Sequence, residues 1–160
     1  MRALLLTLVA LVAGCAAEPY DAHENDAPLL AFELGLPLTF DVGAQLSDAQ
    51  LEAVAEAVDQ LNNAAGFVVL RRVDRNARAH VTTELPNAPP GTALAQAQVS
   101  PSGRCDLRMA AVTHTSVFVH EFMHCLGFVH SDDPSSLMFA FYADGQRLTD
   151  EDVAALRALR

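Results

Sequence analysis

Apolar and polar residues alternate along much of the chain in a way that predicts short strands. The segments that alternate, or that are rich in apolar and β-branched residues, predict five strands, at 36–42, 67–73, 79–85, 93–99 and 104–112. The last two strands lie on either side of a turn with the sequence Ser-Pro-Ser-Gly, at residues 100–103. The spacing therefore predicts a sheet built from short strands.

Three other segments repeat apolar residues at helical spacing. The first follows a capping box, with Ser47 as N-cap and Gln50 three residues later, and it ends near Gly66. The second covers 116–126, and the third covers 149–159, with a Thr as N-cap and three acidic residues in its first turn. The order is strand, helix, four strands, helix, loop, helix, which predicts an α+β fold with helices covering a sheet.

The N-terminal residues, 1–15, have the pattern of an export signal. Met and Arg precede an apolar run that is too short to span a membrane. The run ends in Val-Ala-Gly before Cys15, which resembles the bacterial lipobox, where the cysteine is lipidated after cleavage. Ordinary signal cleavage nearby, for instance after Ala17, is the alternative.

Residues 16–27 are small, polar and acidic, which predicts a flexible tether to one folded domain at 28–160. Ala rather than Asp follows Cys15, which resembles the sorting pattern of outer-membrane lipoproteins. We therefore expect an exported protein of the bacterial cell envelope, anchored to the outer membrane by lipid on Cys15 and otherwise secreted.

The net charge limits the expected binding partners, and the number of cysteines suggests a disulfide. The formal net charge is −10, and all twenty acidic residues follow the export signal. This charge argues against binding to nucleic acid, and it leaves the lipid anchor as the one expected contact with a membrane. If Cys15 carries lipid, Cys105 and Cys125 remain, and in an exported protein such a pair indicates a disulfide. Two buried free thiols are the alternative.

The chemistry is concentrated in residues 120–130, His-Glu-Phe-Met-His-Cys-Leu-Gly-Phe-Val-His. Two histidines four residues apart on a helix lie about 40° apart around its axis and about 6 Å apart along it. The imidazoles of His120 and His124 can therefore reach one metal ion. Gly127 can adopt a positive φ, end the helix and return the chain, so that His130 becomes a third ligand. Three neutral imidazoles leave an open position on a tetrahedral zinc, which is the arrangement of a catalytic site.

Glu121 is not needed as a ligand, because three histidines are present. It can take a proton from a zinc-bound water, which then attacks a carbonyl polarised by zinc, and it can return that proton to the leaving amine. The other side of the same helix carries an apolar stripe that can pack on the sheet, made of Val119, Phe122, Met123 and Leu126. The sequence therefore predicts one catalytic Zn²⁺ on a helix with a buried anchor.

The run from His120 to His130 resembles the metzincin motif His-Glu-x-x-His-x-x-Gly-x-x-His. After it, Ser-Leu-Met-Phe at 136–139 stands where matrixins place their Met-turn, and 148–153 looks like the start of the matrixin C-terminal helix. The likeness is specific from Val119 onwards, whereas at 28–112 it is a compatible order of elements.

The resemblance to matrixins implies the rest of the architecture and the site. It implies a twisted, mostly parallel five-stranded sheet with an antiparallel edge strand, packed by three helices. Met138 would form the floor under the zinc, and residues 93–99 would be the edge strand that pairs with an extended peptide or protein substrate. The wall of the pocket beside the scissile bond would be lined by substrate-binding residues Phe139, Phe141 and Tyr142.

The sequence departs from the matrixin pattern at three places. Met123 stands where matrixins usually have Gly, which can crowd the site. Residues 75–86 are short and poor in ligands for the structural zinc and calcium loop of animal matrixins, so calcium is possible but not indicated, and His80 is read as a strand residue. Only the short tether separates Cys15 from Pro28, so we expect no propeptide with an inhibitory cysteine.

The leading hypothesis is a zinc-dependent endopeptidase that acts as a monomer. A catalytically silent, zinc-containing binding protein is the second hypothesis, and Glu121 argues against it because a scaffold has no use for that base. A zinc amidase acting on cell-wall peptides is the third hypothesis, since it would use the same chemistry.

Overall fold

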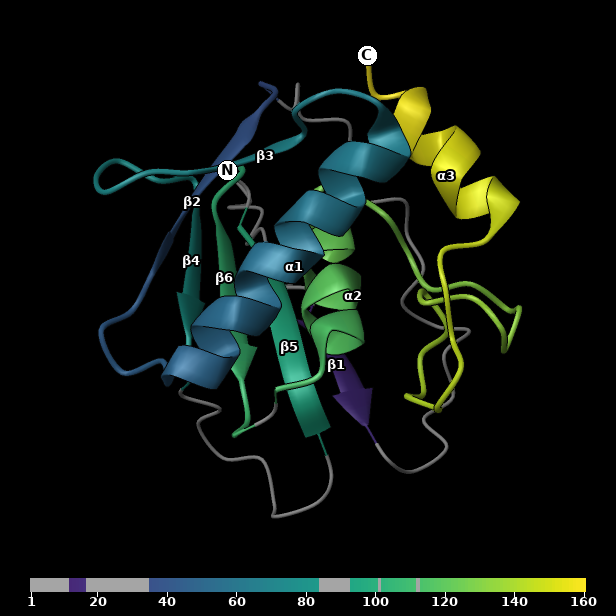
Figure 1. The fold of residues 1–160 in the computed structure, drawn as a ribbon, viewed down its shortest axis with the longest axis horizontal. Coiled ribbons are helices and arrows are strands. Elements are labelled where there is room, and N and C mark those ends of the chain that lie inside the picture. Colours follow the sequence, from purple (N-terminus) through teal and green to yellow (C-terminus); the bar gives the residue numbers. More distant parts are fainter. Residues whose placement is uncertain (1–11, 17–34, 84–92, 101, 112) are drawn as a thin grey trace, which may run out of the picture.

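The computed structural model describes residues 12–16, 35–83, 93–100, 102–111 and 113–160. Within them lies a six-stranded sheet with the order β1-β5-β6-β4-β2-β3, shown in Figure 1. Its strands are β1 Val12–Ala16, β2 Leu38–Val42, β3 Leu70–Arg72, β4 Ala79–Thr82, β5 Ala93–Val99 and β6 Cys105–Met109. The helices are α1 Asp48–Ala65, α2 Thr115–Cys125 and α3 Asp150–Arg157.

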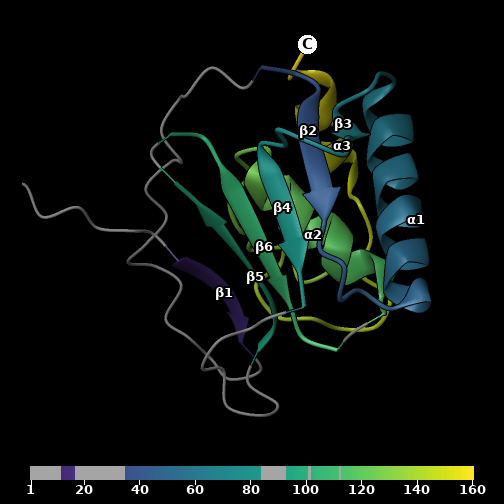
Figure 2. The same ribbon diagram turned by 90° about the vertical axis from the view of Figure 1, so that its left-hand side faces the viewer.

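The predicted α+β fold is confirmed. Strands β3, β2, β4 and β6 are parallel neighbours, and β5 is antiparallel to β6. These five strands are the sheet that the sequence predicts, although β2, β3, β4 and β6 are shorter than the predicted segments. The sixth strand, β1, comes from the segment predicted to end the export signal, and it pairs antiparallel with the outer side of β5. Figure 2 shows β1 beyond β5, at the far end of the sheet from α1.

Helix α1 begins and ends where its local sequence predicts. The backbone N–H of Gln50 donates to the Ser47 side chain, and the Gln50 side chain accepts from the Ser47 backbone, which completes the capping box. Gly66 has a φ of 78°, the left-handed conformation that suits glycine after the last turn. The Asn62 side chain then bonds to the backbone N–H groups of Val69 and Leu70, so the end of α1 positions β3.

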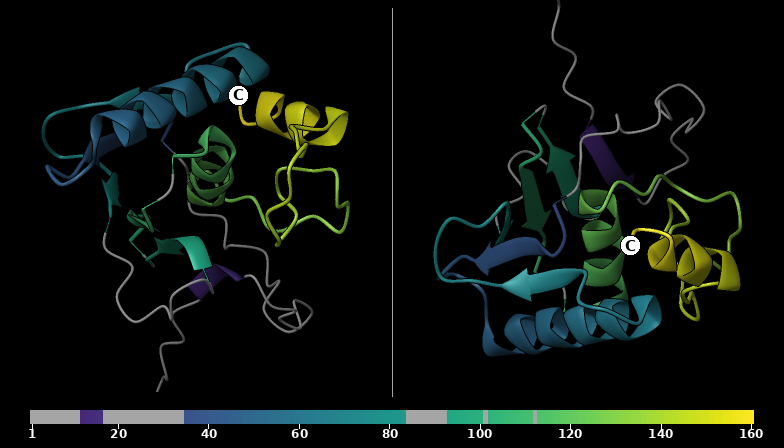
Figure 3. Two further views of the ribbon diagram at one scale, coloured as in Figure 1. Left: turned by 60° about the horizontal axis from the view of Figure 1, so that its bottom comes forward. Right: turned by 90° about the horizontal axis from the view of Figure 1, so that it is seen from above.

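The three helices differ in how deeply they lie in the fold. Helix α2 packs between α1 and the strands β5 and β6, and its residues from Val117 to Cys125 are all buried. A helix that is buried on every side belongs to the core, and the predicted apolar stripe of α2 is part of it. Helix α3 packs against α1, as Figure 3 shows. The Arg157 side chain donates to the carbonyl of Ala64 near the end of α1.

The alternation of residues along the strands separates the core from solvent. Leu38 and Phe40 of β2 point toward the helices, and the Phe40 ring meets Phe122 of α2 at 5.1 Å between centroids. Asp41 and His80 are paired in register on β2 and β4 and contact each other, and both are partly exposed. The helix-facing side of the sheet is therefore apolar, as the pattern predicts.

A disulfide joins the sheet to the central helix. Cys105 at the start of β6 and Cys125 at the end of α2 are bonded, with their Cα atoms 5.6 Å apart. Because Cys125 follows His124 directly, the bond fixes the last turn of α2 against the sheet. Among the residues that the structure describes, no helix is both long enough and apolar enough to cross a membrane.

Candidate metal centre

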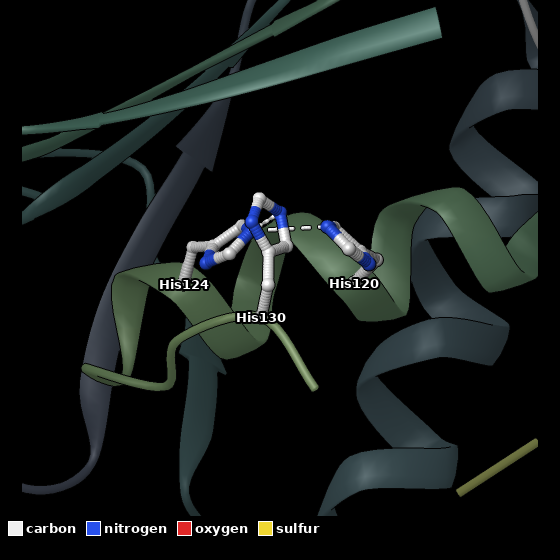
Figure 4. A group of neighbouring side chains, drawn as sticks. All are labelled: His120, His124 and His130. Atoms are coloured by element: carbon white, nitrogen blue, oxygen red, sulfur yellow. Dashed lines mark hydrogen bonds between the residues drawn. The ribbon is translucent and has the colours of Figure 1, made fainter. Parts of the chain in front are cut away.

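Three histidine side chains converge at the end of α2. His120 and His124 come from the helix, and His130 comes from the segment after it, as Figure 4 shows. The Nε2 atom of His124 lies 2.9 Å from Nε2 of His120 and 3.2 Å from Nε2 of His130. Within the described part of the chain, these three histidines form the only group of three or more His, Cys, Asp or Glu side chains able to share a metal ion.

The turn that returns His130 to the helix depends on Gly127. Its φ is 93°, in the left-handed region that side chains other than glycine rarely adopt. The N–H of Gly127 donates to the carbonyl of His124 at 2.9 Å, and the N–H of Phe128 donates to the carbonyl of Met123 at 3.0 Å. These bonds close the helix and reverse the chain, as the sequence predicts.

Backbone carbonyls fix the orientation of the two helical imidazoles. Nδ1 of His120 lies 2.5 Å from the carbonyl of Leu137, and Nδ1 of His124 lies 2.8 Å from the carbonyl of Phe128. A carbonyl can only accept, so Nδ1 carries the proton in both rings and the lone pair remains on Nε2. This is the tautomer in which Nε2 can bind a metal, with the other nitrogen held by a second partner.

The surroundings keep these imidazoles neutral. Burial lowers the pKa of His120 to about 4, assisted by the charge of His130 and opposed by the bond to Leu137. Burial also lowers the pKa of His124 well below its ordinary value, and His120 and His130 add to the effect. A neutral imidazole is the form that ligates a metal, so the pair needs no deprotonation near neutral pH.

The donor set fits one zinc ion. A tetrahedral zinc with Zn–N bonds of about 2.0–2.1 Å places its nitrogen ligands about 3.3–3.4 Å apart. The separations of 2.9 and 3.2 Å between the Nε2 atoms are close to this spacing. Lone pairs of neutral imidazoles that point at one place repel each other, and a cation between them relieves that repulsion. Three protein ligands would leave one position open for a reactant.

A small cavity lies beside the histidines. The cavity is partly open to solvent. Three elements line it, namely β5, α2 and the loop after His130, with the residues Leu94, Ser116, Val117, His120, Glu121, Leu137, Phe139, Tyr142 and Gln146. Glu121 is fully buried and shares this wall with His120. Glu121 therefore lines the same cavity as His120, one of the three candidate ligands.

The loop after His130 is held together by its own hydrogen bonds, and the place of Met138 as a floor under zinc stays a prediction. Met138 is 1% exposed, its carbonyl accepts from the N–H of Ser131 at 2.8 Å, and its N–H donates to Oγ of Ser136 at 2.9 Å. The Ser136 hydroxyl in turn donates to Asp152 at 2.9 Å. From the sequence, Asp152 is expected only as an acid in the first turn of a helix. The structure adds a second role, in which it anchors this loop.

The residues predicted to bind substrate divide into two groups. Phe139 and Tyr142 line the cavity, and Tyr142 remains 37% exposed with its ring 5.3 Å from that of His114. Phe141 is not among the lining residues, and it packs edge-on against Phe139 at 5.7 Å instead. Phe139 and Tyr142 therefore lie in the wall of this cavity, Phe141 packs against Phe139, and substrate binding by the three residues stays a prediction.

Sequence reasoning missed several of the lining residues. Ser116 and Val117 precede His120 by about one helical turn, so the helical repeat could have placed them on the same face. Gln146 has no such signal: its side chain donates to the carbonyl of Phe141 at 2.7 Å and accepts from the N–H of Ala143 at 3.1 Å.

The structure also places Met123 and Cys15, two residues to which the sequence analysis gave a role. Met123, expected to crowd the site, is fully buried in the core cluster and is not among the lining residues of the cavity. Cys15 lies within β1, and its lipidation stays a prediction.

Comparison with models of protein families identifies a family that this chain matches. The family model described as Matrixin matches residues 35–160. This range contains every described element except β1, together with all three histidines and Glu121. A comparison with curated proteins found no match.

Proposed function

We propose that this chain, which belongs to the matrixin family, is a zinc-dependent endopeptidase in which Glu121 acts as the general base. The family and the three-histidine group support a zinc metallopeptidase. The observation that carries the finer proposal is the position of Glu121, which is fully buried and lines the same cavity as His120. A carboxylate in that position serves hydrolysis and has no role in holding the ion.

The residues would divide the reaction between them. Zinc, when bound by His120, His124 and His130, supplies a Lewis acid that polarises a substrate carbonyl and lowers the pKa of a nearby water. Glu121 accepts the proton of the attacking water and later delivers it to the departing amine. The carbonyl of Leu137 holds the His120 ring in place throughout, so the ligand does not have to reorient.

The same cavity suggests the kind of substrate. Its wall includes aliphatic and aromatic side chains, with Leu94 from β5, Val117 from α2, and Phe139 and Tyr142 from the loop after His130. We propose that it takes an apolar side chain of an extended peptide, from the residue just after the cut bond. The backbone of that peptide would pair with β5, which carries Leu94.

A peptide-library cleavage assay tests the proposal. Purified protein loaded with zinc should cut peptides of an unfolded protein, and a chelator should abolish the cutting. Cleavage of cell-wall peptides alone would favour the amidase. Zinc binding without any turnover would favour a silent binding protein, and failure to bind zinc would contradict the proposal at its base.

A further inference from the structure

The outer edge of β5 is already occupied by the chain itself. Residues Val12–Ala16 form β1 and run antiparallel along β5, with Val12 opposite Gln98 and Ala13 opposite Ala97. The pairing continues to Ala16, opposite Ala93, after a register shift between Gly14 and Ala16. As Figure 2 shows, β1 lies on the open side of β5, where no other described strand is present.

This pairing lies beside the cavity of the metal centre. Leu94 is a cavity residue, and it is the neighbour of Ala93, which pairs with Ala16. The end of β1 therefore lies at the level of the cavity along β5. Helix α2, with the ligands His120 and His124, packs against the same strand. A peptide that entered the site along β5 would meet β1 first.

One edge of a strand can pair with only one partner at a time. Its outward N–H and C=O groups form a single row, and antiparallel pairing uses that row. An extended substrate would need the same groups of β5 that β1 occupies over Ala93 to Gln98. Binding of the two is therefore mutually exclusive along this length.

We infer that β1 is a built-in competitor for the substrate-binding edge, so that the unprocessed chain is held in a self-blocked state. The inference rests on the proposed function, because it takes β5 as the strand that binds substrate. The sequence of β1 is Val-Ala-Gly-Cys-Ala, which offers few large side chains, so its hold on β5 depends mainly on the main chain. Such a segment blocks the edge while it is part of the chain and leaves easily when it is cut.

Export processing would remove the block. Hydrolysis of the Gly14–Cys15 peptide bond by an export peptidase, as the lipobox pattern predicts, separates three of the four residues with an assigned partner on β5. The fragment then leaves with the export signal, because only a few main-chain bonds hold it. Cleavage after Ala17 would remove all of β1. The first cut leaves only Ala16 opposite Ala93, and the second frees the whole edge of β5. Activity would therefore rise once the chain has left the compartment where it is made.

Cross-linking and release of β1 test this in the full chain. The protein would be made by cell-free synthesis, so that no export peptidase acts, with Cys15→Ser as the parent. The locked variant adds Ala13→Cys and Ala97→Cys, a directly paired couple, and is oxidised. The released variant carries Ala13→Pro and Gly14→Pro, which remove two backbone donors from β1. Ala13→Val with Gly14→Ala is its control, since both changes keep the N–H groups.

The expected order of cleavage rates is released, then parent and control together, then locked. The released variant should be on the order of tenfold faster than the parent, because the blocked fraction no longer reduces apparent affinity. Reduction should raise the rate of the locked variant to that of the parent under the same reductant, which controls for the Cys105–Cys125 bond. Equal rates for the released and locked variants would overturn the inference.

A binding measurement separates this inference from the proposed function. The probe is a labelled peptide with the sequence of residues 10–17 and Ser in place of Cys15. It should bind the released variant in trans and fail to bind the locked variant. If no variant cleaves any peptide but the probe still discriminates in this way, β1 is the occupant of the edge and the peptidase proposal fails. If the probe binds both variants equally, the self-blocked state is refuted whatever the activity.

Discussion

The hydroxyl of Ser136 donates a hydrogen bond of 2.9 Å to the carboxylate of Asp152, and both side chains are buried. This bond joins the loop after His130 to the first turn of α3. The same serine accepts from the N–H of Met138. Between the two lies Leu137, whose carbonyl holds the His120 ring. Asp152 is therefore connected to His120, a candidate metal ligand, through Ser136 and Leu137.

Replacing Asp152 should weaken both the fold and the metal centre. Asp152→Ala leaves the Ser136 and Thr149 hydroxyls without their shared acceptor, and we expect a loss of about 1–3 kcal/mol in the free energy of unfolding. Zinc affinity should fall as well, because the Leu137 carbonyl is no longer held. Urea unfolding and competition with a chelating dye measure the two effects. Asp150→Ala, an exposed change in the same turn, should alter neither, and an equal loss there would contradict the role given to Asp152.

Replacing Glu121 or a histidine should distinguish a loss of turnover from a loss of zinc binding. Glu121→Ala keeps all three ligands, so we expect about one zinc per chain and a fall in turnover of about 10²–10⁴-fold, the usual contribution of a general base. His124→Ala should lose both zinc and turnover. Metal content by mass spectrometry and peptide cleavage give the two readings. A Glu121→Ala protein as fast as wild type would show that another group supplies the base.

Gly127 should matter for the metal site beyond its cost in stability. Gly127→Ala forces a side chain into the left-handed region, at a cost of about 1–2 kcal/mol, and displaces the turn that carries His130. Gly145 has a similar φ of 90° with open space around it, so Gly145→Ala is a matched control. Both variants should lose stability to denaturant, but only Gly127→Ala should lose zinc affinity. Equal zinc affinities would mean that His130 is placed by something other than this turn.

Removal of the disulfide should destabilise the helix that carries the site. The bond closes a loop with a sequence separation of 20, and its loss in Cys105→Ser with Cys125→Ser should cost roughly 3 kcal/mol in the chain-entropy description. Denaturant unfolding of the double variant measures this change. Intact mass after alkylation without reductant checks the bond itself, and two alkylated thiols at these positions in the wild type would exclude it.

The cavity should select the residue that follows the cut. Mapping of cleavage products should show apolar residues at that position, because five of the nine lining residues are aliphatic or aromatic, namely Leu94, Val117, Leu137, Phe139 and Tyr142. Val117→Phe fills part of the cavity and should shift the preference toward smaller side chains by at least about tenfold, the lower end of the effect of one methylene group in an apolar pocket. Turnover of peptides with Ala at that position should remain, which serves as the control. A preference for charged residues in the wild type would remove this cavity from the substrate site.

Local patterns predict the helices and the convergence of the three histidines well, because the physics behind them is local. The capping box of Ser47 and Gln50 spans three residues, and His120 to His130 is fixed by one helix and one glycine turn. The cavity is different, since Leu94 and Gln146 reach it from elements that are far apart in sequence. No local sequence pattern near Leu94 or Gln146 indicates that the two residues line the same cavity.

The strand β1 shows a second limit. Its small and apolar residues suit both the end of an export signal and a strand, so composition cannot separate the two roles. Only the register with β5 identifies the strand. The bond between Ser136 and Asp152 is similar, because a Ser and an Asp sixteen residues apart carry no mark of their contact.

Helix α2 is buried from Val117 to Cys125, whereas the wall of the cavity is completed by partly exposed residues such as Phe139, Tyr142 and Gln146. These two parts of the site are therefore under different constraints. Most changes in α2 disturb the packing of the whole core, so the reacting groups are held nearly invariant. Changes in the loop alter which side chain fits and leave the core intact. Substitutions in this loop can therefore change the substrate preference among related proteins while the catalytic chemistry stays the same.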